Sequence, residues 1–103
     1  MLHPRYIEIL EECKKLSDKK NQNYATDDDP LSNLRASQEL GFRPSDGVAM
    51  RMQDKIKRWV ELRKGKPDEV GESIIDTLKD LINYTAFEIL FLEEEALDKQ
   101  ETK

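Results

Sequence analysis

The sequence predicts an all-α fold, a small helical bundle of three long helices plus a short one. Apolar residues recur at three- and four-residue steps in three long segments. No segment shows the alternation of polar and apolar residues that marks a half-buried strand. The four glycines and four prolines lie mainly between these segments, where turns are expected. A chain of 103 residues suits one domain, which we expect at residues 1–98, followed by a frayed tail at 99–103.

The first long helix is predicted at residues 4–20. Pro4 suits a first helical turn, where an N–H is not needed, and the lysines up to Lys20 complement the negative end of the helix dipole. The side expected to face the core is formed by Tyr6, Ile9, Leu10, Cys13 and Leu16.

Two shorter segments follow. The stretch "NQNYATDDDP", residues 21–30, is polar and rich in turn-forming residues, so a loop is predicted. A short helix is then predicted at residues 31–40, with Ser32 as candidate N-cap and Gly41 ending it.

The second long helix is expected to begin after Pro44, with Ser45 or Asp46 as its N-cap. Gly65 fits the position just past the helix end, and Pro67 prevents continuation. The apolar positions of this helix are Val48, Ala49, Met52, Ile56, Trp59, Val60 and Leu62.

The third long helix is predicted from near Asp68 to about Asp98. Its expected apolar stripe is Ile74, Leu78, Leu81, Ile82, Thr85, Ile89 and Leu92. A domain this small buries only roughly two-thirds of the surface that its unfolded chain exposes. We therefore expect the bundle to be completed by association into a homodimer or a higher homo-oligomer.

A row of acids lies on one side of this third helix. Four acids and an amide share that side at 100° per residue, and we call them the acid row: Glu69, Glu72, Asp76, Asp80 and Asn83. An ordinary solvated face mixes charges, because like charges four residues apart repel. The same side continues into Phe87 and Leu90, which are apolar. The acid row is therefore open to two interpretations, a solvated face or a face that other parts of the protein cover.

The motif "RMQDKIKR" of the second helix offers the matching cations. Arg51, Asp54, Lys55 and Arg58 lie near one another at steps of three and four. They form either a surface ladder of ion pairs or, opposite the acid row, a site for magnesium and phosphate. Magnesium prefers carboxylate oxygens, and lysine and arginine neutralise phosphate oxygens. In the second interpretation Asp54 completes the metal shell while Arg51, Lys55 and Arg58 bind phosphate.

The bulk composition excludes some function classes. The net charge of −5 argues against non-specific binding to duplex nucleic acid, which needs clustered cations. With Cys13 as the only cysteine, no internal disulfide can form, and a reducing compartment fits. We find no apolar run suited to a signal peptide or a membrane span, so a cytoplasmic protein without membrane contact is expected.

Three motifs occur in an order that resembles a known family: "YATDDDPLSNL", "RMQDKIKR" and "DEVGESIIDTLKDLINY". Together they resemble a compact branch of the MazG-like all-α NTP pyrophosphohydrolase superfamily, the branch associated with nucleotide modification. The resemblance covers residues 20–87, about two-thirds of the chain. It implies a helical bundle, dimeric or larger, that binds magnesium through acids on two helices. It also implies hydrolysis of an NTP or dNTP to monophosphate and pyrophosphate.

The resemblance assigns roles to individual residues. Asp76 resembles the last helix aspartate of the family, Glu72 its partner acid, Asp54 the acid of the preceding helix, and Asn83 its amide. The implied metal ligands are thus Asp54, Glu72 and Asp76, to which the acid row adds Asp80. Glu72 and Asp76 are the expected catalytic carboxylates, which orient the attacking water.

The chain departs from the family pattern in two places. The helix acids are four residues apart instead of three, because position 73 is serine. The earlier E-x-x-E pair is absent from "RMQDKIKR". A loss of hydrolysis with nucleotide binding retained therefore remains an alternative.

Two further questions stay open from sequence. Asn23 and Tyr24 could bind the base or sugar, or belong to a plain polar connection. The whole chain could instead be a non-catalytic helical module for dimerisation or partner docking. Cations set opposite the acid row favour the enzyme, because a docking module does not need them.

Overall fold

The computed structural model describes residues 1–24, 31–66 and 73–101, without the side chains of residues 21–24 and 100–101. Every regular element in these ranges is a helix, which confirms the predicted all-α class. The elements are α1 (Pro4–Tyr24), the 3-10 helix η1 (Ser32–Leu40), α2 (Pro44–Arg63) and α3 (Ile74–Glu101).

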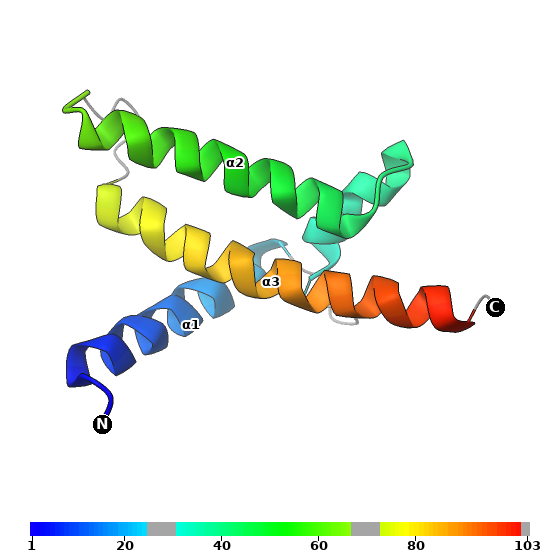
Figure 1. Cartoon of the computed structure of the whole chain (residues 1–103), viewed down its shortest axis with the longest axis horizontal. Coiled ribbons are helices and arrows are strands. Elements are labelled where there is room, and N and C mark those ends of the chain that lie inside the picture. Colours follow the sequence, from blue (N-terminus) through cyan, green and yellow to red (C-terminus); the bar gives the residue numbers. More distant parts are fainter. Residues whose placement is uncertain (25–30, 67–72, 102–103) are drawn as a thin grey trace.

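Helix α3 is the centre of the arrangement. It lies beside α2 and runs in the opposite direction, while α1 crosses the first half of α3 (Figure 1). The short η1 packs against the beginning of α2. Charged residues of α1 and α2 can therefore meet only where both approach α3.

Helix α1 is longer than predicted. It continues to Tyr24, so residues 21–24, which were expected in a loop, form its last turn. No glycine or proline interrupts the chain between Pro4 and Pro30, and nothing local therefore ends the helix at Lys20. The rest of the predicted loop, residues 25–30, lies outside the described residues.

The short helix is of the 3-10 type, and its N-cap is Leu31 instead of the expected Ser32. Its end agrees with the prediction. Gly41 adopts a left-handed conformation with φ of 84°, and its N–H donates to the Gln38 carbonyl at 3.0 Å.

The expected N-cap of α2 is also wrong. The helix begins at Pro44, with Arg43 as N-cap, and Asp46 lies at the third helical position. There the Asp46 carboxylate accepts a hydrogen bond from the Arg43 backbone N–H at 3.1 Å. At the other end, Gly65 has φ of 84°, as the prediction requires.

Helix α3 begins at Ile74, later than the predicted start near Asp68, because Ser73 and Asp76 cap it. Residues 67–72, on which the earlier start was predicted, lie outside the described residues. The Asp76 N–H donates to Ser73 Oγ at 3.0 Å, and the Ser73 N–H donates to Asp76 Oδ2 at 3.3 Å. The helix continues to Glu101, three residues past its predicted end near Asp98.

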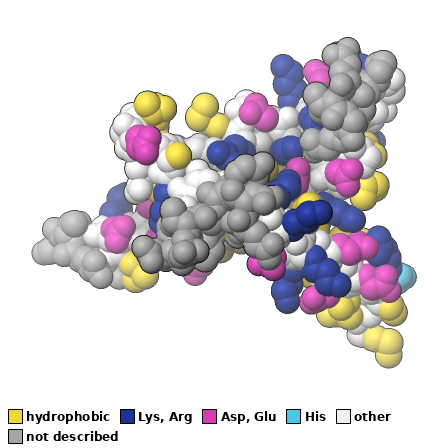
Figure 2. Space-filling model, turned by 180° about the vertical axis from the view of Figure 1, so that it is seen from behind, with side chains coloured by type: hydrophobic (Ala, Val, Ile, Leu, Met, Phe, Trp, Pro, Cys, Tyr) yellow, Lys and Arg dark blue, Asp and Glu magenta, His cyan; other side chains and the backbone are white. Residues whose placement is uncertain are grey.

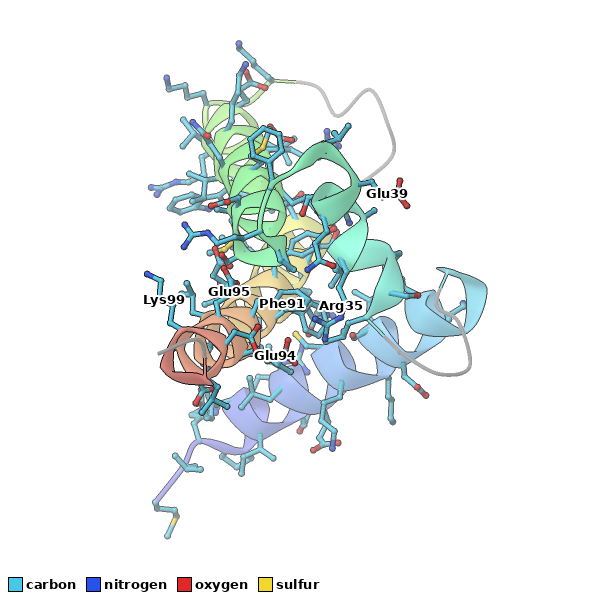
Figure 3. All side chains as sticks on the ribbon, turned by 90° about the vertical axis from the view of Figure 1, so that its right-hand side faces the viewer. Arg35, Glu39, Phe91, Glu94, Glu95 and Lys99 are labelled. Atoms are coloured by element: carbon cyan, nitrogen blue, oxygen red, sulfur yellow. The ribbon has the colours of Figure 1, made fainter. Side chains whose placement is uncertain are left out.

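The core is small and lies between η1, α2 and α3. Leu34, Val48 and Phe91 are buried there. Arg35 of η1 lies over the Phe91 ring, 4.9 Å from its centre, and donates two hydrogen bonds to Glu94 at 2.9 and 3.2 Å (Figure 3). Partly buried residues surround this core: Leu31, Met52, Tyr84, Phe87 and Leu90.

The predicted apolar stripe of α3 contributes no residue to the buried core, although its first three members, Ile74, Leu78 and Leu81, are partly buried. Ile82, Ile89 and Leu92 are 38%, 56% and 51% exposed, whereas Asp80 and Phe91 on another side of the helix are buried. The neighbouring helices approach α3 from the side of the acid row. Of the two interpretations of the acid row, a covered face holds at Asp80, which is buried, and a solvated face holds at Asp76, which is exposed.

The remaining surface is mixed in character. Basic and acidic side chains are interspersed over the face opposite to the view of Figure 1, with hydrophobic groups exposed among them (Figure 2). No helix in the described part of the chain has the length and apolar character needed to cross a bilayer.

Candidate functional site

Asp80 is the point at which three helices meet. Its side chain lies on α3 and is largely buried, with the residue 7% exposed. Asp80 Oδ1 accepts a hydrogen bond from Lys20 Nζ of α1 at 2.7 Å, and Asp80 Oδ2 lies 3.0 Å from Lys55 Nζ of α2. We call these three residues the lysine–aspartate centre.

The electrostatics of this centre favour an ionised carboxylate. Burial alone would raise the pKa of Asp80, but hydrogen bonds from Lys20 and Lys55 outweigh it, and the pKa lies below its usual value. With Asp80 ionised and both lysines protonated, the three side chains carry a net charge of about +1. A buried acid paired with a lysine from each of the two neighbouring helices stabilises the junction of the helices.

The other predicted metal ligands are not gathered at Asp80. Asp76 is exposed and caps α3, and Asp54 is exposed on α2. Glu72 lies outside the described residues. Within those residues, no three acids, histidines or cysteines are close enough together to hold a metal ion.

The predicted phosphate-binding cations lie along one side of α2. Lys55 contacts the acid row at Asp80, and its side chain is 20% exposed. Arg51, one turn earlier, is exposed, and Arg58, one turn later, is partly buried. The structure thus brings together Lys55 and Asp80 from two separate motifs.

A groove adjoins the lysine–aspartate centre, with a volume of about 600 Å³ between α1 and α3. Two acids, two lysines and a serine line it from α1, and three residues line it from α3: Glu11, Lys14, Lys15, Ser17, Asp18, Asn83, Ala86 and Phe87. Ser17 and Asn83 each lie one helical turn from a residue of the centre, since residues three apart share a helix side. The groove and the centre therefore lie about one helical turn apart along α1 and along α3, and none of the three residues of the centre lines the groove.

Asn83 has a definite partner in this groove. Its amide nitrogen donates to the Cys13 backbone carbonyl of α1 at 3.0 Å. The Cys13 thiol is buried, and burial raises its pKa. Asn23 and Tyr24 belong by their backbone to the last turn of α1, but their side chains lie outside the described part of the structure.

Lys20 is the member of the centre that sequence reasoning missed. Its position at the end of a predicted helix explained it as a complement to the helix dipole. The only signal was that Lys20 directly precedes the stretch expected to contact a ligand. Its partner Asp80 lies sixty positions later in the chain, and no local pattern links the two.

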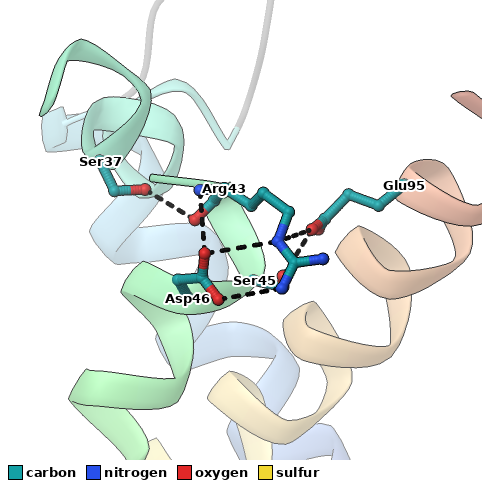
Figure 4. Close-up of polar contacts among 5 residues, drawn as sticks. All are labelled: Ser37, Arg43, Ser45, Asp46 and Glu95. Carbon is teal, nitrogen blue, oxygen red and sulfur yellow. Dashed lines mark hydrogen bonds and ion pairs between the residues drawn. The ribbon is translucent and has the colours of Figure 1, made fainter. Parts of the chain in front are cut away.

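A second polar network lies near the other end of α3. Ser45 is buried and donates to Glu95 Oε1 at 2.6 Å, and Arg43 Nε lies 3.5 Å from the same oxygen (Figure 4). Arg43 also contacts Asp46, and the Ser37 hydroxyl donates to the Arg43 carbonyl at 3.1 Å. This network fixes the beginning of α2 against η1 and α3.

Comparisons of the chain with protein-family models, curated proteins and solved structures found no match.

Proposed function

We propose that this protein binds a nucleoside triphosphate and hydrolyses it to the monophosphate and pyrophosphate. The observation that carries the proposal is the contact between Asp80 of the acid row and Lys55 of "RMQDKIKR". A nucleotide site needs cations opposite the acid row, whereas a docking surface does not, so this contact favours the nucleotide site. Binding of an NTP or dNTP is the function that this geometry supports best.

The groove supports the same proposal. A volume of about 600 Å³ lies within the range of small-molecule sites. Phe87 offers an aromatic surface to a base, and the Asn83 amide offers polar atoms. Phe87 lies seven residues from Asp80, which is about 10 Å along a helix. This spacing suits a ligand with a flat ring at one end and phosphates at the other.

Magnesium is expected to accompany the nucleotide. Both oxygens of Asp80 are engaged by lysines, so Asp80 is poorly suited to be a metal ligand in this arrangement. Asp54 and Asp76 are exposed, and magnesium in nucleotide sites uses one or two carboxylates together with the phosphates. The described acids therefore fit a magnesium–nucleotide complex and do not fit a resident cluster of several metals. When bound, magnesium supplies positive charge that polarises the phosphate oxygens.

The residues of the chain would divide the remaining tasks. Lys55, with Arg51 and Arg58 on either side, would neutralise the charge that develops on the phosphates. Asp76, together with Glu72, would orient the attacking water.

A second candidate function is dimerisation or partner docking without catalysis, and the exposed side of α3 favours it. Ile82, Ile89 and Leu92 present an apolar surface that the described part of the chain leaves exposed. Burial of such side chains contributes about 1.5–3 kcal/mol each. We propose a homodimer through this side. A dimer is compatible with the enzyme and would also be the whole function if nucleotides do not bind.

Thermal unfolding with a panel of nucleotides tests the proposed function. A ligand at 100 times its dissociation constant adds roughly 2.7 kcal/mol to the free energy of unfolding. We expect at least one NTP or dNTP, standard or modified, to raise the melting temperature in the presence of magnesium. If the whole panel leaves the melting temperature unchanged, with and without magnesium, the nucleotide function is wrong and the dimerisation module remains.

A further inference from the structure

Lys20 occupies a position that suits a ligand-binding cation. Its side chain is 49% exposed, although its ammonium group donates to a largely buried carboxylate. An ammonium group has three donors, and Asp80 engages one of them with a distance of 2.7 Å. A side chain with this exposure is accessible to a ligand from solvent.

Asp80 holds this cation at the same place as Lys55. The two ammonium groups belong to α1 and α2, and each contacts a different oxygen of one carboxylate. Two lysines so close together would repel each other without the acid between them. Asp80 thus allows two positive charges to share one small volume, and the pair is fixed in place before a ligand arrives.

We propose that Lys20 and Lys55 form one binding site for a polyphosphate chain, and that Asp80 is its positioning residue and not a metal ligand. The site takes phosphate oxygens directly, so it does not require a divalent cation. The end of the α1–α3 groove lies one helical turn away, at Ser17 and Asn83, and would hold the rest of the ligand.

This inference rests on the proposed function for the identity of the ligand, but it makes a separate claim. The function requires hydrolysis of a nucleotide, whereas the lysine site requires only that a triphosphate bind when metal is absent. Inorganic tripolyphosphate is therefore the suitable probe, since it lacks base and sugar.

Isothermal titration calorimetry of the full chain with tripolyphosphate, in buffer containing EDTA, tests the site. We expect saturable binding to the wild-type protein. Lys20→Gln should weaken it about tenfold or more, as expected for loss of a charge-assisted hydrogen bond. Lys19→Gln is the matched control, because Lys19 is an exposed neighbour on the same helix and its loss changes the net charge equally. Lys20→Arg, which keeps the charge, should retain most of the affinity.

A double-mutant cycle tests the role of Asp80. If Asp80 positions Lys20, the Lys20→Gln substitution should cost less than about threefold in an Asp80→Asn background, since neighbouring groups that act together are not additive. Equal costs in both backgrounds would show that Asp80 does not position Lys20.

The other outcomes are equally decisive. The site is refuted if tripolyphosphate does not bind in EDTA, or if Lys19→Gln weakens binding as much as Lys20→Gln. Hydrolysis of a nucleotide together with metal-dependent tripolyphosphate binding would refute this site and leave the proposed function intact. Tripolyphosphate binding in EDTA, without hydrolysis of any nucleotide, would support this site and refute the proposed hydrolysis.

Discussion

The Asn83 side chain of α3 donates a hydrogen bond to the Cys13 backbone carbonyl of α1, 3.0 Å away. This bond ties the two helices together beside the groove, at the place where the family resemblance puts a substrate-binding amide. Asn83 therefore has a structural partner whether or not a nucleotide binds.

Asn83→Ala should lower the free energy of unfolding by about 1 kcal/mol, the usual contribution of one hydrogen bond. Urea unfolding followed by circular dichroism measures this change. Thr85→Ala is a suitable control, because Thr85 lies two residues later on an exposed part of α3 and bonds only within its own helix. An unchanged unfolding midpoint for Asn83→Ala would show that the bond does not hold α1 against α3.

Asp80→Asn should destabilise the protein at neutral pH by roughly 1–3 kcal/mol, because it removes hydrogen bonds between charged groups. The pKa of Asp80 is lower in the folded protein than its ordinary value. The stabilisation of the folded protein by ionised Asp80 is therefore complete above the ordinary aspartate pKa of about 4. It is lost as the pH falls through the pKa of Asp80 in the folded state.

Unfolding free energies of the two proteins between pH 2 and pH 8 check this prediction. The difference between wild type and variant should be largest above pH 5 and should shrink in acid. A difference that stays constant over the whole range would mean that the charge of Asp80 contributes nothing.

Glu88 should behave in the opposite way. Burial, followed by the nearby charges of Glu95 and Asp46, raises the pKa of Glu88. Ionisation of Glu88 therefore lowers the free energy of unfolding. This destabilisation is absent below the ordinary pKa near 4.3 and is complete above the pKa of the folded state.

Glu88→Gln should accordingly raise stability at pH 7 and should have little effect at pH 3. Glu93→Gln, at an exposed position of the same helix, serves as the control and should have little effect at either pH. A loss of stability in Glu88→Gln at neutral pH would contradict the assigned direction.

The exposed side of α3 predicts the oligomeric state. Substitution of both Ile82 and Ile89 by glutamate should convert the protein to a monomer, because each isoleucine buried at an interface contributes about 1.5–3 kcal/mol. Sedimentation equilibrium measures the association. Leu40→Glu is the control, since Leu40 is 79% exposed on η1, away from this side of α3. If the wild-type protein is already monomeric at high concentration, the proposed dimer is wrong.

Local features of the fold could be predicted from sequence because they depend on neighbouring residues. The glycines at 41 and 65 adopt the left-handed conformation that helix ends require. The beginning of α3 was placed too early, since the S-x-x-D pattern of Ser73 and Asp76 was read as part of a helix already under way. That pattern is a capping box, and its recognition would have given the correct beginning.

The side of α3 that faces the core could not be predicted in the same way. The helix has apolar residues on two sides, with Phe87 and Phe91 on one and Ile82 and Ile89 on the other. Periodicity alone does not tell which side the chain covers itself and which it leaves exposed. The acid row was a better guide, because its continuation into Phe87 indicated a covered face.

The candidate site was predictable in part for a similar reason. The sequence indicated that the rows containing Lys55 and Asp80 face each other, because each row lies on one side of its own helix, but it assigned Asp80 to a metal and not to a lysine. The contact of Lys20 could not be predicted from sequence, since it depends on how far α1 extends and where it crosses α3.

Pyrophosphate release from a panel of NTPs and dNTPs, standard and modified, is the most direct test of the proposed function. We expect magnesium-dependent release from at least one nucleotide by the wild-type protein. Lys55→Gln should lower kcat/KM about tenfold or more, whereas Lys57→Gln, an exposed neighbour on α2, should leave it nearly unchanged. No release from any nucleotide, or equal release by the wild-type protein and Lys55→Gln, would contradict the account.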